Sequence, residues 1–117
     1  MTSTLPPSTH RSGDLDRFGS IVRDLRTVLD GVKRALDEEI RAYPTPIPRC
    51  DAQFNHLYEH RARLTRILGR VNATLERGTA AEDLADALAE FAAAPAFSDS
   101  ADEKALRARI GAALALR

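Results

Sequence analysis

Apolar residues recur at alternating spacings of three and four in the first third of the chain, and this pattern constrains the fold more than any other feature. The residues that follow it are Leu15, Phe18, Val22, Leu25, Leu29, Val32 and Leu36, with Ile21, Val28 and Ala35 at the edges of the stripe. Such spacing places apolar side chains on one face of an α-helix and leaves the other face to charged residues. The pattern predicts a long amphipathic helix from Asp14 to Ala42.

Three prolines at alternate positions, Pro44, Pro46 and Pro48, end this helix. Proline lacks a backbone N–H and drives the preceding residue out of the helical conformation, so we expect a short, stiff corner here. A second stripe follows the corner and consists of Phe54, Leu57, Leu64, Leu68, Val71 and Leu75. This stripe predicts a second long helix, from about Cys50 to Arg77.

Arg61 interrupts the second stripe, because it takes a position that the spacing reserves for an apolar side chain. A cation at such a position must either reach past the core to water or meet a carboxylate. Glu39 stands at the corresponding point of the first helix and is the candidate partner.

Two shorter helices are predicted after the second long one. Gly78 is typical of the position just after a helix, and Thr79 with Glu82 has the spacing of a capping box, which opens the next helix. Ser100 and Glu103 repeat this spacing before the last helix. The apolar residues of the two helices are Leu84, Leu88 and Phe91 in the first and Leu106, Ile110 and Leu114 in the second.

The four helical segments predict an all-α fold, namely a small antiparallel bundle in which two long helices form a hairpin and two short helices complete it. Residues 1–13 contain paired prolines and no apolar period, so we predict a flexible N-terminal tail there. The remaining 104 residues, 14–117, are predicted to form a single helical domain, because a chain of this length suffices for one core.

The charge balance disfavours two classes of partner. Lys and Arg number 17, and Asp and Glu also number 17, so the formal net charge is zero. Nucleic acids and anionic membranes both reward a net basic surface. In addition, the single Cys50 cannot form an internal disulfide, and no apolar run is long enough to span a bilayer. We therefore expect a cytoplasmic protein that does not bind membranes.

A basic strip nevertheless follows one side of the second helix and consists of Arg49, His56, Arg63, Arg66, Arg70 and Arg77. The third helix is acidic, with Glu82, Asp83, Asp86 and Glu90. The two helices could pair electrostatically, both faces could be solvated, or the strip could meet an anionic partner. A nucleic-acid-binding module is less favoured, because the strip lacks interleaved aromatic residues for base stacking.

Residues 43–63 hold the only Cys, both Tyr, three of the six Pro and two of the three His. His56 and His60 are four residues apart, so they share one side of a helix, and imidazoles are common metal ligands. A zinc site needs three or four ligands, however, and Cys50 is predicted on the apolar face while His56 faces outward. We predict neither a metal nor another cofactor.

Two helices with a histidine near the middle have the layout of helical phosphorelay domains, so a phosphorelay module with His56 or His60 as the phosphate acceptor is a further, less favoured alternative. The run from Tyr58 to Gly69 also resembles the histidine-kinase box across a dozen residues. The matching residues are Glu59, Arg61, Leu64, Thr65, Ile67 and Gly69. Tyr58, however, stands at the position of the phosphorylated histidine, and Arg63 stands at the position of the box proline. A nucleophile, a base and an orienting group are nowhere found together, so we predict that the protein is not an enzyme.

The two short helices carry few large apolar residues and so are expected to cover the long pair incompletely. An apolar stripe left uncovered is most simply buried by a partner protein or by a second copy of the chain. We therefore expect a non-enzymatic helical protein-interaction or adaptor protein. The alternative is a small ligand-binding or metal-binding helical bundle.

The proline corner is the predicted partner-binding site, because its stiff backbone can present polar side chains with little entropy left to lose. The predicted binding residues are Arg49, Asp51, Gln53, Asn55, His56 and Glu59. The competing interpretation is that the corner is only a structural strap between two helices.

Overall fold

A computed structural model describes residues 6–45, 51–77 and 80–116 of the chain. Four α-helices make up most of these residues, namely α1 (Pro6–Arg41), α2 (Ala52–Arg77), α3 (Ala81–Ala93) and α4 (Ala101–Ala115). No strand occurs within these ranges, so the prediction of an all-α fold is confirmed. None of the helices described is both long enough and apolar enough to cross a membrane.

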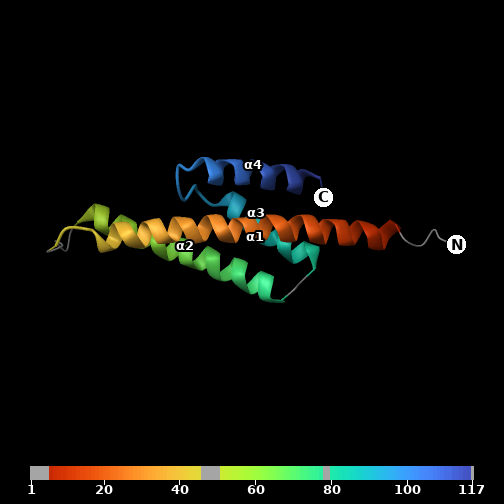
Figure 1. Cartoon of the computed structure of the whole chain (residues 1–117), viewed down its shortest axis with the longest axis horizontal. Coiled ribbons are helices and arrows are strands. Elements are labelled where there is room, and N and C mark those ends of the chain that lie inside the picture. Colours follow the sequence, from red (N-terminus) through yellow and green to blue (C-terminus); the bar gives the residue numbers. More distant parts are fainter. Residues whose placement is uncertain (1–5, 46–50, 78–79, 117) are drawn as a thin grey trace.

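The longest helix, α1, is the axis of the molecule, and each of the other three helices packs on it. Figure 1 shows α2 running back along α1 from the corner, with α3 and α4 beside the middle of α1. The short helices α3 and α4 also pack on each other, and α3 packs on α2. Within the described parts of the chain α4 does not pack on α2, so one side of α1 between these two helices is left without a helical cover.

The predicted apolar stripes form the core. Residues from all four helices are fully buried, namely Val22, Leu25, Leu29, Leu64, Leu88, Phe91 and Ile110. Burial of a large aliphatic side chain stabilises a fold by about 1.5 to 3 kcal/mol, so this cluster dominates the free energy of folding. Leu15, the first residue of the predicted stripe, is 40% exposed, and from Gly13 onward, where burial is described, the first buried side chain of α1 is Phe18.

The predicted start of the first helix at Asp14 is wrong, because α1 begins eight residues earlier at Pro6. The first turn of a helix has no internal acceptor for its backbone N–H groups, so the prolines Pro6 and Pro7 lose nothing there. Residues 6–13 of the predicted tail are therefore helical, while residues 1–5 lie outside the described residues. The division into a tail and one domain stays a prediction.

The two predicted capping boxes have different outcomes. At α3 the N-cap residue is Ala80 and makes no side-chain cap hydrogen bond, so the prediction of a Thr79 cap is wrong; Thr79 itself lies outside the described residues. The helix starts one residue later than the motif requires, which places a methyl side chain at the cap. At α4 the Ser100 half of the box is confirmed, because the Ser100 hydroxyl accepts a hydrogen bond from the Glu103 backbone N–H at 3.1 Å. The reciprocal bond is not made, because the Ser100 backbone N–H donates to the Ser98 hydroxyl at 3.3 Å and not to Glu103.

Arg61 meets a different carboxylate from the one predicted. Its Nε lies 2.8 Å from an Asp37 carboxylate oxygen, so Glu39 is not its partner. The packing of α1 against α2 brings Asp37 opposite Arg61, and the register of two helices cannot be read from either one alone. Asp37 also accepts a hydrogen bond from Lys33 at 3.1 Å, and this bond, with the charge of Arg61 beside it, lowers the pKa of Asp37.

Candidate binding groove

An open groove of about 640 Å³ lies along the part of α1 that approaches the corner, and we call it the α1–α2 groove. Its floor is α1, one wall is the start of α2, and the other wall is the α3–α4 loop with the first turn of α4. The lining residues are Thr27, Val28, Gly31, Val32, Ala35, Leu36 and Glu39 on α1, His56, Leu57 and His60 on α2, and Phe97, Ser98, Ser100 and Asp102 on the third side.

The floor of the groove exists because the apolar stripe of α1 is wider than its neighbours cover. Val28 and Val32 are half-buried, while Gly31 and Ala35, each three residues further along the helix, are exposed. These residues follow the same three-four spacing as the core. Because α4 does not reach α2, this edge of the stripe faces solvent and not another helix.

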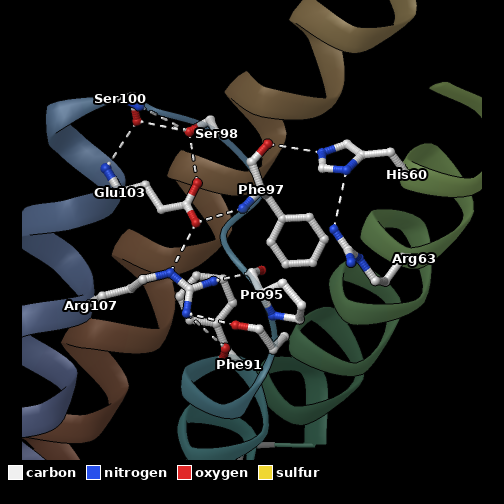
Figure 2. A network of polar contacts seen from close by, with 10 residues as sticks. His60, Arg63, Phe91, Pro95, Phe97, Ser98, Ser100, Glu103 and Arg107 are labelled. Carbon is white, nitrogen blue, oxygen red and sulfur yellow. Dashed lines mark hydrogen bonds and ion pairs between the residues drawn. The ribbon is translucent and has the colours of Figure 1, made fainter. Parts of the chain in front are cut away.

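One wall is tied to the other by His60. Its Nε2 lies 2.9 Å from the Phe97 carbonyl oxygen, and its Nδ1 lies 3.2 Å from Nη2 of Arg63, as Figure 2 shows. An arginine can only donate, so Nδ1 must accept, and the Nε2–H tautomer then donates to the Phe97 carbonyl. The Arg63 guanidinium also lies over the Phe97 ring, 4.8 Å from its centroid, which fixes this aromatic side chain against α2.

The loop wall is held from its other side by Glu103, whose side chain is 1% exposed. Its carboxylate accepts hydrogen bonds from the Phe97 backbone N–H at 2.9 Å, the Ser98 hydroxyl at 2.7 Å and Arg107 Nε at 3.0 Å. Burial alone raises the pKa of this carboxyl, but the bonds from Phe97, Ser98 and Arg107 together outweigh burial and lower the pKa.

Arg107 completes this network by capping the end of α3. Its guanidinium donates to the carbonyl oxygens of Phe91 at 3.3 Å, Ala94 at 3.0 Å and Pro95 at 3.2 Å. It also stacks over the Phe91 ring at 4.1 Å. Figure 2 shows these contacts converging on the loop between α3 and α4. The buried Glu103 and the half-buried Arg107 are thus both engaged in holding the loop that forms this wall of the groove.

Three polar side chains of the groove are not engaged in this way. In the described part of the chain, Glu39, His56 and Asp102 make no side-chain hydrogen bond and no ion pair, and all three are exposed. Carboxylates accept hydrogen bonds and attract cations, and an imidazole ring can donate or accept a hydrogen bond. The groove therefore combines an apolar floor with polar groups that are free to bond with a bound molecule.

The carboxylate of Asp51, one of the predicted binding residues, is already hydrogen-bonded to neighbouring residues of the corner. It accepts hydrogen bonds from the Phe54 backbone N–H at 2.9 Å and from the Tyr43 hydroxyl at 2.6 Å, so it caps α2. The Tyr43 bond and then the Phe54 bond lower the pKa of Asp51, while the same Tyr43 bond raises the pKa of the phenol. Tyr43 further contacts Phe54 edge to face at 5.0 Å.

The other predicted binding residues are not brought together. His56 lines the groove, whereas Gln53, Asn55 and Glu59 are exposed on α2 outside its lining. Arg49 lies outside the described residues. A binding role for this set stays a prediction. The α1 side of the groove was missed, although Val28 and Ala35 at the edges of the stripe were a usable signal.

The histidine pair and the basic strip of α2 are the two other features that the sequence singled out. The rings of His56 and His60 lie 6.1 Å apart, and no group of three candidate metal ligands lies together among the residues described, which do not include Cys50. Part of the strip pairs with the acidic helix, because Arg70 forms an ion pair with Glu90 at 2.8 Å.

Comparisons of the chain with protein-family models, curated proteins and solved structures found no match.

Proposed function

We propose that the protein is a non-enzymatic helical interaction or adaptor protein that binds a partner protein in the α1–α2 groove, with α1 and α2 acting as a hairpin-like scaffold. The observation that carries this proposal is the edge of the α1 stripe, Val28 to Ala35, which faces solvent beside a fully packed core. Apolar surface removed from water contributes about 25 cal/mol per Å², so covering this edge favours association.

Rigid walls support the same function. The His60 and Glu103 contacts hold the loop wall in place before any partner arrives. A preorganised surface loses little conformational entropy on binding, which leaves more of the contact energy as affinity. Glu39, His56 and Asp102 at the edge of the groove can add specificity, because none of them makes a side-chain hydrogen bond or an ion pair within the described residues.

Binding a small ligand is the second candidate, since a volume of about 640 Å³ falls within the range of ligand pockets, roughly 300 to 1,000 Å³. Such pockets, however, enclose most of their ligand. Seven of the fourteen lining residues here are exposed, namely Thr27, Gly31, Ala35, Glu39, His56, Ser100 and Asp102, so the groove would leave a small ligand largely in water.

The proposal is tested by placing a photo-crosslinking amino acid at Gly31, in the floor of the groove, and separately at Gly69 on α2. A side chain added at either glycine meets nothing within 4 Å, and Gly69 does not line the groove. We expect a protein partner to crosslink at Gly31 and not at Gly69 in cells of the natural host. The partner is then purified and its affinity for Gly31→Met and Gly69→Met is measured directly.

The expected result is a loss of at least tenfold in affinity for Gly31→Met, with unchanged affinity for Gly69→Met. Equal binding by the two variants, or equal crosslinking at the two positions, would contradict a role for the groove. Native mass spectrometry of the gently purified protein covers the second candidate, because a bound small molecule adds a fixed mass that Gly31→Met should remove.

A further inference from the structure

We infer that the occupant of the α1–α2 groove is an amphipathic α-helical segment of another protein, about three turns long, with basic residues at both ends. The inference rests on the proposed function and specifies the chemistry of the partner. It follows from the length of the groove, the spacing of its floor and the charges at its ends.

The length of the floor corresponds to a short helix. The floor runs from Thr27 to Glu39 on α1, which is about 18 Å at 1.5 Å per residue. Val28, Val32 and Ala35 are spaced by four and three residues, and such a row forms a ridge that packs between the side chains of a facing helix. Gly31 and Ala35 are small, so a facing helix can approach α1 closely.

A helical occupant also satisfies the hydrogen-bonding groups of its own backbone. An extended segment in an apolar groove would need partners for its backbone N–H and C=O groups, and the described residues offer no sheet edge to provide them. A helix satisfies these groups internally. Figure 1 shows α3 and α4 beside the middle of α1 and the corner end of α1 and α2 extending beyond them, so a bound helix would add to the bundle where it is thinnest.

The charges of the groove select a basic occupant. Glu39 lies at the corner end, and Asp102 lies at the other end, where it also lines a neighbouring hollow with Asp24 and Arg109. Asp24 and Arg109 form an ion pair at 2.8 Å, so Glu39 and Asp102 are the carboxylates that face an occupant of the groove. No Lys or Arg is among the lining residues that the structure describes, and the nearby Arg63 is turned onto His60 and Phe97. Lys or Arg residues near the two ends of a three-turn helix would meet these two carboxylates.

A second copy of the chain does not supply such a helix. The large apolar side chains exposed in the described residues are Leu15 near the start of α1, Tyr58 on α2 and Leu116 at the end of α4. They lie on three different elements, so apart from the groove floor itself no exposed face of the described residues carries an apolar stripe three turns long. Two groove floors facing each other would bring the Glu39 and Asp102 carboxylates of both copies together, which like-charge repulsion disfavours. The occupant is therefore assigned to a different protein.

The test is a selection of displayed 14-residue helical peptides against the full-length protein, with no bias in charge. We expect the enriched peptides to carry apolar residues at alternating three-four spacing with Lys or Arg near both ends. Synthetic copies should be helical when bound, by circular dichroism. They should bind Gly31→Met at least tenfold more weakly than wild type and Gly69→Met with unchanged affinity.

The charge requirement is tested separately with matched pairs of variants. Glu39→Gln combined with Asp102→Asn should lower the affinity for the basic peptides at least tenfold and reduce the dependence of that affinity on salt concentration. The control is Glu38→Gln combined with Asp99→Asn, which neutralises adjacent exposed carboxylates outside the groove and should leave binding unchanged. Helicity and melting temperature of each variant are checked first.

The following outcomes would overturn the inference. Enrichment of acidic, uncharged or extended peptides, enrichment of none, or equal effects of the two double variants would show that the groove does not select a basic helix. A dimer that Gly31→Met converts to a monomer would identify a second copy as the occupant. In these cases the proposed function still stands if the crosslinked partner binds Gly31→Met more weakly than wild type. It fails if that partner binds Gly31→Met and wild type with equal affinity.

Discussion

At the scale of single residues, the pair Glu103 and Arg107 decides the conformation of the α3–α4 loop. A buried carboxylate is costly unless its oxygen atoms are bonded, and here both oxygens of Glu103 accept hydrogen bonds. Removing one member of such a network costs more than the pair contributes, because the partner is left unsatisfied. Since the loop carries Phe97, the same pair also holds one wall of the α1–α2 groove.

We predict that Glu103→Gln destabilises the protein by about 1 to 3 kcal/mol, because the amide turns a donor toward groups that themselves donate. Urea unfolding at neutral pH measures the loss. The control is Asp83→Asn, an exposed residue at the same third position of α3, which also removes a charge near a helix start. An equal loss in the control would assign the effect to the helix terminus and not to the network.

The difference between wild type and Glu103→Gln should depend on pH. The pKa of Glu103 in the folded protein lies below its ordinary value of 4.5, so its stabilising effect is complete above that value and is lost as pH falls through the folded pKa. We therefore expect the two unfolding free energies to converge below about pH 4.5. Asp37 and Asp51, whose pKa values are also lowered, are present in both proteins and cancel in this comparison. A difference that stays constant down to pH 3 would refute this assignment.

At the scale of elements, the register of α2 is the feature that the rest of the bundle depends on. Leu64 is fully buried, whereas Arg66, two residues later, is exposed. The two positions lie about 200° apart around the helix, at 3.6 residues per turn, so they report on opposite faces.

Leu64→Asp should unfold the protein or cost at least about 4 kcal/mol, since it buries a charge without a partner. Arg66→Asp, by contrast, should change the unfolding free energy by no more than about 0.5 kcal/mol. Thermal melts followed by circular dichroism distinguish the two variants. Comparable losses in both would mean that α2 is rotated relative to the arrangement described here.

At the scale of the whole molecule, the protein is elongated. The Cα radius of gyration is 17.9 Å, against about 13 Å expected for a compact chain of this length, and the extents are 73 × 26 × 18 Å. The cause is α1, whose 36 residues extend beyond the other helices, as Figure 1 shows. Only its central part is covered on several sides, which is why an apolar edge is left at the corner end.

Deletion of residues 1–13 should leave the melting temperature within a few degrees of wild type. The deletion removes the first turns of α1 but no buried residue described, because the core of α1 begins at Phe18. Small-angle X-ray scattering should record a smaller radius of gyration for the truncated protein. A melting temperature lowered by more than a few degrees would show that this segment contributes to the fold.

Much of the architecture was determined by local physical chemistry and could be predicted. The three-four spacing specified which faces of α1 and α2 are apolar, and the prolines after Ala42 had to end a helix. Ser100 caps α4 because a short side-chain oxygen at that position can reach the backbone N–H of Glu103. Each of these results depends on residues within a few positions of one another, which is why the sequence alone was sufficient.

Only the tertiary structure decided which distant groups meet. Arg61 pairs with Asp37 and not Glu39 because of the register between two helices, and the Glu103 carboxylate turns to Phe97 and Arg107 because the α3–α4 loop passes over it. The groove depends on α4 packing on α1 without reaching α2. Such contacts join residues far apart in the chain, and no local pattern carries their geometry. The sequence by itself therefore determined the helices and their apolar faces, and the packing of those helices determined which part of a face remained open.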